Sequence, residues 1–240
     1  MKKNSGLTAP WEITEEMFLN EEESATLLAF LTQREKLAGE DSRVSVGVDR
    51  LIVELLLHSG LRNSELCRLR VVDTIAGHGE SVLKVAGTPK QDRTVYIPKL
   101  TSDLVRRFIK QVRPHCLPAG SDASDLRMPL ILNERGNIYD RTALYRRVVR
   151  ILTEAGLEDR ASVQLLRHTY GYLAYKRTGG NLLFVQRQLG HAHPMVTAVY
   201  AQFVDHPAAD LAELAGGGKR SEPKAATKSA AQPRKKGTRK

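Results

Sequence analysis

Several side chains that could do chemistry in this chain stand where helices are expected to begin or end. Arg62 lies within residues 60–66, GLRNSEL, at a junction between two predicted helices. Backbone N–H groups at such a junction, together with a guanidinium, can hold an anion such as phosphate. Taken alone, a surface arginine beside a helix cap is the commoner arrangement.

Lys90 stands in the predicted turn of a β-hairpin, within residues 90–98, KQDRTVYIP. An ammonium at a hairpin tip can enter a groove or an active site, where it can protonate a leaving alkoxide. A solvated lysine in a turn is the commoner case, so this residue decides nothing by itself.

A further group of polar side chains follows in the last third of the chain. Gln164 and Arg167 are three residues apart, so they share one face of a predicted helix. His168 is expected to point elsewhere, into packing or a cap. His191 stands at a predicted helix end, and Tyr200 follows nine residues later. A lone histidine or tyrosine at such a place is usually structural.

The elements that must position these residues are predicted to be mostly α-helices with a small antiparallel β-sheet, an α+β fold. Asn20 and Glu23 form a capping-box sequence before helically spaced leucines. Strands are expected at 81–85 and 93–97, joined by a turn at 87–92, and residues 130–132 could form another. The expected helices are 20–37, 46–58, 63–70, 101–112, 141–155, 162 or 164 to 177, 181–189, 194–203 and 208–215.

Length and composition limit the class of protein. The 240 residues suit one large domain or two small ones. Cys67 and Cys116 are the two cysteines, which excludes a disulfide scaffold and argues for a reducing compartment. The longest apolar run, residues 51–57, is too short to cross a bilayer, and residues 1–10 lack the apolar stretch of a signal peptide. We therefore expect a soluble cytoplasmic protein.

The positive charge is concentrated at the C-terminus. Residues 216–240 contain nine Lys and Arg against Glu222, and so carry +8 of the formal +10. Their composition predicts a disordered basic arm for phosphates, and a solvated tail that aids solubility is the alternative. The residues expected to contact nucleic-acid phosphates are Lys219, Arg220, Arg234, Lys235 and Lys236.

The order and spacing of these pieces resemble the catalytic domain of the tyrosine recombinases, also called the phage integrase family. The most specific stretch runs from LRHT at 166–169 through LGH at 189–191 to Tyr200. Residues 60–66 resemble the first arginine motif of the family. Counting back from Pro98 places Lys90 on the family's hairpin lysine, whereas counting forward along the turn places Thr88 there.

The resemblance implies a site-specific DNA recombinase, or integrase, that needs neither a metal nor a nucleotide cofactor. Tyr200 would attack a backbone phosphorus and form a 3′-phosphotyrosine. Arg62 and Arg167 would clamp the non-bridging oxygens, since a guanidinium is a planar and permanently charged donor. Lys90 would protonate the leaving 5′-oxygen, and His191 would donate a hydrogen bond to the phosphate.

By the same resemblance the chain has three parts. They are an irregular lead-in at 1–14, an integrase-like catalytic domain at 15–215 and the basic tail at 216–240. The chain would be a short form without the N-terminal core-binding domain of most relatives, because only about 45 residues precede the second predicted helix.

The expected partner is double-stranded DNA, bound by a homotetramer on two sites, with accessory proteins as further partners and no membrane. The expected location is the cytoplasm, in association with the nucleoid. Residues 208–215 have a small apolar stripe and are a candidate for a segment exchanged between neighbouring subunits. A helix docked on its own subunit is the alternative.

One position departs from the family pattern. Gln164 stands three residues before Arg167, where relatives usually have histidine. Glutamine can hydrogen-bond a phosphate but cannot accept the proton of Tyr200. Slower cleavage, a neighbouring base and lost activity are all open, so a catalytically silent DNA-binding relative, acting as a regulator or architectural protein, is the main alternative. A topoisomerase relative is a further one. His191 and His193 could be a metal pair, but no third ligand is evident.

Overall fold

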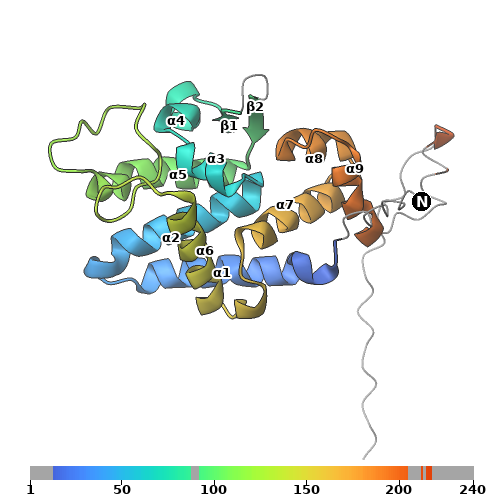
Figure 1. Ribbon diagram of the computed structural model, residues 1–240, viewed down its shortest axis with the longest axis horizontal. Coiled ribbons are helices and arrows are strands. Elements are labelled where there is room, and N and C mark those ends of the chain that lie inside the picture. The colour runs from blue at the N-terminus through green and yellow to red at the C-terminus, as the bar shows by residue number, and fades with distance from the viewer. Residues whose placement is uncertain (1–12, 88–91, 205–211, 213–214, 218–240) are drawn as a thin grey trace, which may run out of the picture. The chain divides into compact units, whose positions relative to one another are not determined.

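The computed structural model describes residues 13–87, 92–204, 212 and 215–217, and the chain divides into two compact units after Val204. The first unit is mostly helical with a two-stranded antiparallel sheet, which confirms the predicted fold class (Figure 1). Its helices are α1 (Glu21–Leu37), α2 (Glu40–Ser59), α3 (Asn63–Arg68), α4 (Ile75–His78), α5 (Lys99–Gln111), α6 (Arg141–Glu154), α7 (Val163–Arg177), α8 (Leu182–Leu189) and α9 (Met195–Ala198). The strands are β1 (Val82–Val85) and β2 (Arg93–Tyr96). The short 3-10 helices are η1 (Glu15–Met17), η2 (Val71–Asp73), η3 (Arg113–Cys116), η4 (Glu158–Arg160) and η5 (Val199–Phe203).

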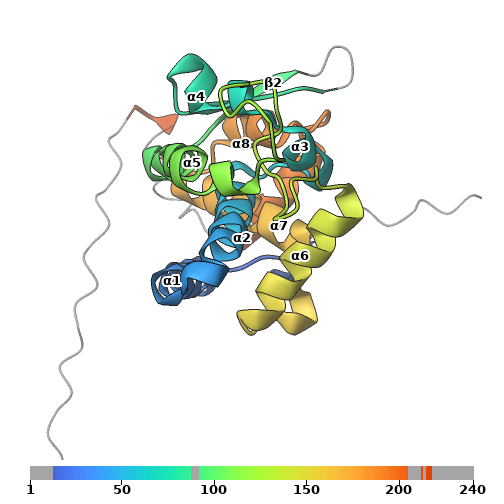
Figure 2. The same ribbon diagram turned by 90° about the vertical axis from the view of Figure 1, so that its left-hand side faces the viewer.

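Helix α2 is the centre of the main core. It packs against α1, α5, α6 and α7, and Figure 2 shows these helices arranged around it. Each large apolar side chain buried in this way contributes about 1.5–3 kcal/mol to stability. The fully buried apolar residues of α2 include Val48, Leu51, Ile52, Leu55 and Leu56.

A buried carboxylate also ties α2 to its neighbours. Asp49 is fully buried, and its Oδ1 accepts from the Nε of Arg147 in α6 at 2.6 Å. Arg34 of α1 and Arg150 of α6 pair with the same carboxylate, each at 3.1 Å. Paired in this way, the charge is tolerated inside the fold, and α1 and α6 are held against α2.

A second apolar cluster joins α7 to the C-terminal elements of this unit. Phe18 stacks on Tyr172 of α7, with 4.3 Å between the ring centroids. Val185 and Leu189 of α8, and Tyr200 of η5, belong to the same buried cluster. The packing therefore places the ends of α7, α8 and η5 close together.

The sheet connects α8 with the first half of the chain. Strands β1 and β2 pair in register from Val82 opposite Tyr96 to Val85 opposite Arg93, and β2 packs on α8. The predicted hairpin is confirmed, whereas the tip that carries Lys90 lies outside the described residues.

The predicted elements differ from the structure at several boundaries. Helix α2 begins at Glu40 instead of residue 46, because Glu40 and Asp41 supply a favourable acidic first turn. Residues 130–132 do not form a strand, since Leu132 makes only an isolated bridge, to Ile138. The helix expected at 194–203 divides into α9 and η5.

The segment predicted as a helix at 208–215 lies outside the described residues, apart from residues 212 and 215. The basic tail lies outside them from residue 218 onward. Within the described part of the chain, no helix is both long and apolar enough to cross a membrane.

Candidate active site

Arg62 is positioned by the tight turn that ends α2. Gly60 ends this helix with φ of 61°, a left-handed conformation that favours glycine, and a Cβ there would lie 2.5 Å from the ring of Tyr170. The chain then turns into α3 with Arg62 at the N-cap. The guanidinium donates to Glu65 Oε1 and to the carbonyl oxygen of Gly190, both at 3.0 Å. Its side chain is 45% exposed, so it remains open to a ligand.

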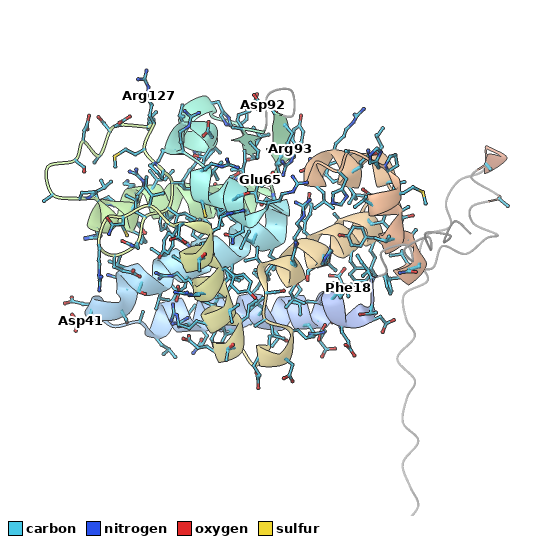
Figure 3. All side chains as sticks on the ribbon, viewed as in Figure 1. Phe18, Asp41, Glu65, Asp92, Arg93 and Arg127 are labelled. Carbon is cyan, nitrogen blue, oxygen red and sulfur yellow. The ribbon has the colours of Figure 1, made fainter. Side chains whose placement is uncertain are left out.

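Glu65 anchors a second arginine beside the first. Arg93 of β2 donates to Glu65 Oε1 at 2.6 Å and to Oε2 at 2.8 Å, and its Nε donates to the carbonyl of Gln188 at 3.0 Å. Figure 3 shows the two side chains facing each other between α3 and β2. Burial would raise the pKa of Glu65, but the hydrogen bonds from Arg93 and Arg62 outweigh it and lower this pKa to about 2. The carboxylate therefore stays ionised.

Arg167 is the most deeply buried cation of the group. Ser162 caps α7, and Arg167 lies in the second turn of this helix with 6% of its surface exposed. Its guanidinium donates to the carbonyl of Gly60 and, at 2.8 Å, to the carbonyl of Leu189. Burial and the charge of Arg62 lower its pKa to about 10, so it is still protonated at neutral pH.

These carbonyls come from the C-terminal ends of α2 and α8, where the helix dipoles are negative. The hydrogen-bond partners that the structure describes for Arg167 are both main-chain oxygens. A carboxylate partner, as Glu65 is for Arg93, would offset the charge. Arg167 therefore offers a less compensated positive charge to an anion.

His191 follows the left-handed Gly190 that ends α8. Its Nδ1 lies 2.8 Å from the hydroxyl oxygen of buried Thr197. Burial, and then the charges of Arg167 and Arg62, lower the pKa of His191 to about 4, so the ring is neutral at pH 7. The tautomer in which Nδ1 accepts from Thr197 carries its proton on Nε2, a donor suited to an anion.

Tyr200 is packed beneath this surface. Only 1% of the residue is exposed, and burial raises its pKa to about 12. The ring lies against the backbone of α7 at Gly171, where a Cβ would come within 2.3 Å of the ring atom Cζ. The hydroxyl lies 3.1 Å from Nδ1 of His168. His168, which was expected to point into packing or a cap, is half-buried and lies against Tyr200, because η5 packs onto α7.

Two pockets share Arg62 in their walls. One has a volume of about 490 Å³ and is also lined by Arg167 and by Gln164, whose side chain is exposed. The other, of about 690 Å³, has a basic lining suited to a polyanion. Its cationic and imidazole side chains are Arg62, Arg68, Arg93, Arg187 and His191.

The structure thus brings together Arg62, Arg167, His191 and Gln164 from distant parts of the sequence, with Tyr200 beneath them. Lys90 and the five tail residues proposed to bind DNA lie outside the described residues. Within the described part of the chain, no group of three or more His, Cys, Asp or Glu could hold a metal ion.

Sequence reasoning missed three features of the site. In the sequence, Glu65 is an acidic residue near a helix start, and this position does not show whether it caps the helix or binds Arg93. The position of Arg93 indicated only that it belongs to a strand. For His168 the signal was its position one helical turn after Gln164, which puts both on one side of α7.

Comparison with known proteins gives a consistent result. Residues 18–206 match the model of the phage integrase family. The tyrosine recombinase XerH of Helicobacter pylori is 25% identical over 187 residues, which cover 77% of this chain and 48% of that protein. The tyrosine recombinase XerC of Halalkalibacterium halodurans is 32% identical over 183 residues, covering 76% and 56% respectively. The chain therefore spans about half the length of these curated relatives.

Solved structures share the fold. A post-cleavage complex of the XerH site-specific recombinase with a palindromic difH substrate superposes with a TM-score of 0.64 at 24% identity, covering 83% of this chain and 53% of that one. The XerA recombinase gives a TM-score of 0.61 at 22% identity, covering 88% and 65%.

Proposed function

Because the chain belongs to the phage integrase family of tyrosine recombinases, we propose that it is a site-specific recombinase that breaks and rejoins DNA through a covalent bond to Tyr200. One observation carries this proposal. The guanidiniums of Arg62 and Arg167 are held at the ends of α2 and α8, and the phenol of Tyr200 lies against the same helix as Arg167. Two fixed cations beside a nucleophile suit attack on a phosphodiester.

In the proposed reaction the Tyr200 oxygen forms a bond to phosphorus and the bond from phosphorus to the 5′-oxygen breaks. Arg62 and Arg167 would hold the non-bridging oxygens and stabilise the charge of the transition state. His191 would donate a further hydrogen bond. Lys90 is proposed to protonate the leaving 5′-oxygen, and a 5′-hydroxyl would later reverse the step and release Tyr200.

Tyr200 has to move for this chemistry. Its residue surface is 1% exposed, so its hydroxyl cannot meet a phosphate bound in the arginine-lined pockets without a shift of η5. A 3-10 helix has poorer hydrogen-bond geometry than an α-helix, and this one covers five residues. We expect η5 to rearrange when DNA binds.

The proposed partner is double-stranded DNA. The basic lining of the two pockets supports phosphate contacts, which make binding fall with salt. The relative XerH is described as bound to its difH substrate, and the same class of ligand is proposed here. By the same proposal the chain acts as a homotetramer on two DNA sites, with accessory proteins as further partners. Its proposed location is the cytoplasm, on the nucleoid.

A second candidate function is a silent DNA-binding relative. Gln164 and the burial of Tyr200 favour it, because both reduce the readiness of the tyrosine to react. The arginines would then bind DNA phosphates without cleavage.

A covalent-trapping assay separates the two candidates. The protein is incubated with nicked DNA from around its own gene, and SDS-resistant protein–DNA adducts are scored for wild type and Tyr200→Phe. We expect an adduct with wild type and none with Tyr200→Phe. Tyr96→Phe, which removes the hydroxyl of an exposed tyrosine on β2, is the control and should form the adduct. Specific DNA binding without any adduct would favour the silent relative.

A further inference from the structure

A titratable side chain is in contact with the proposed nucleophile. Nδ1 of His168 lies 3.1 Å from the hydroxyl oxygen of Tyr200, within hydrogen-bond distance. The contact joins α7 to η5, and the two residues are 32 positions apart in the sequence. It depends on Gly171, since a side chain at that position would occupy the space of the Tyr200 ring.

The position of His168 relates it to Gln164. The two residues are four apart on α7, so their side chains lie on the same side of the helix, one turn from each other. Gln164 lines a pocket with Arg62 and Arg167 and cannot take a proton. His168 can take one, and it is the residue that touches the phenol.

The surroundings of His168 hold its imidazole in the neutral form, which can accept a proton. Burial, followed by the charge of Arg167, lowers its pKa to about 4, so the ring is neutral at pH 7. His191, itself neutral, interacts with His168, and Tyr200 faces it from η5. A neutral imidazole with its proton on Nε2 accepts at Nδ1 from the phenol.

We propose that His168 is the general base of the reaction and accepts the phenolic proton as Tyr200 attacks phosphorus. This inference rests on the proposed function. In the step, the O–H bond of Tyr200 breaks and an N–H bond forms at Nδ1 of His168. The phenol oxygen bonds to phosphorus, and the 5′-oxygen leaves with the electron pair of its bond and is protonated by the general acid, proposed as Lys90. The imidazole is partly exposed, whereas the phenol is not, so a shift of η5 toward the surface can keep the two in contact.

The test measures the rate of adduct formation on nicked DNA under single-turnover conditions. His168→Gln removes the titratable nitrogen, and we expect cleavage to slow by about 10²–10⁴-fold with DNA affinity unchanged. His115→Gln removes an exposed histidine after α5 and should cleave at the wild-type rate. Gln164→His combined with His168→Gln should recover at least about tenfold of the lost rate, because a base is restored one turn away.

A substrate with sulfur in place of the leaving 5′-oxygen separates a base from an acid. A thiolate leaves without protonation, so on this substrate a variant that lacks the general acid regains its cleavage rate. A variant that lacks the general base stays slow. We expect His168→Gln, and also His168→Asn as a second variant, to remain slow on it. Rescue by Gln164→His would also show that the slow variant is folded.

The outcomes distinguish this inference from the proposed function. If wild type forms no adduct that depends on Tyr200, both fail. If wild type forms the adduct and folded His168→Gln or His168→Asn forms it equally fast or faster, His168 is not the base and the proposed function stands. Relief of their defect by the sulfur substrate would also overturn the assignment.

Discussion

Replacement of Glu65 by glutamine tests the electrostatic basis of the site. Glu65 is 8% exposed and accepts hydrogen bonds from Arg93, at 2.6 and 2.8 Å, and from Arg62, at 3.0 Å. Its pKa falls from the ordinary 4.5 to about 2. One pKa unit corresponds to ~1.36 kcal/mol, so ionisation of Glu65 stabilises the folded chain by about 3 kcal/mol. Glu65→Gln should therefore lower the free energy of unfolding at pH 7 by about 3 kcal/mol.

The sign of the pH dependence provides a second measurement. Because the pKa of Glu65 is lower in the folded chain, its contribution is complete above pH 4.5 and disappears as the pH falls toward 2. Urea unfolding followed by circular dichroism at about pH 6 and about pH 3 should show this decrease in wild type and a smaller decrease in Glu65→Gln. Glu80→Gln changes an exposed carboxylate and should stay within ~0.5 kcal/mol of wild type. A Glu65→Gln protein as stable as Glu80→Gln, with an unchanged pH dependence, would refute the argument.

Two further predictions concern the nucleophile and the tail. Gly171→Ala places a Cβ 2.3 Å from the Tyr200 ring, so we expect a decrease of about 1–3 kcal/mol in the free energy of unfolding, measured by thermal unfolding, and little adduct in the trapping assay. Gly39→Ala, with nothing within 4 Å of its added Cβ, is the matched control, and equal behaviour of the two variants would contradict the packing argument. Deletion of residues 216–240 should reduce the slope of log DNA affinity against log salt by about 0.9 for each phosphate that the tail neutralises, measured by fluorescence anisotropy. An unchanged slope would show that the tail is not a DNA-binding arm.

Local signals in the sequence were sufficient for most elements of the fold. The Asn20 capping box is present as expected, with both reciprocal hydrogen bonds, and Gly60 ends α2 in the left-handed conformation. Such signals act within one helical turn, and so they can be recognised without knowledge of the tertiary structure. The start of α2 was missed because its first turn is polar and lacks the apolar spacing of the rest of the helix.

Long-range pairings in the site could not be predicted in the same way. Arg62 and Arg167 were found through motif order, but the sequence does not show that Glu65 pairs with Arg93, 28 residues away. Glu65, near the start of α3, fits the local sequence pattern of a helix cap whether or not Arg93 binds it. The hydrogen bond between His168 and Tyr200 depends on where η5 packs, which helical spacing within α7 does not determine.

The anchors of the arginines have a consequence for the evolution of such a site. Arg62 donates to the carbonyl of Gly190, Arg93 to that of Gln188, and Arg167 to that of Leu189. Every residue type supplies a carbonyl oxygen, so these partners leave no trace of co-variation in homologous sequences. In a saturation mutagenesis screen Arg167, whose described hydrogen-bond partners are both main-chain oxygens, should therefore be intolerant of change without a second-site side chain that compensates, whereas Arg62 and Arg93 also depend on the side chain of Glu65. Amide-to-ester replacement weakens a single main-chain acceptor, so it can weaken these arginine–carbonyl hydrogen bonds one at a time.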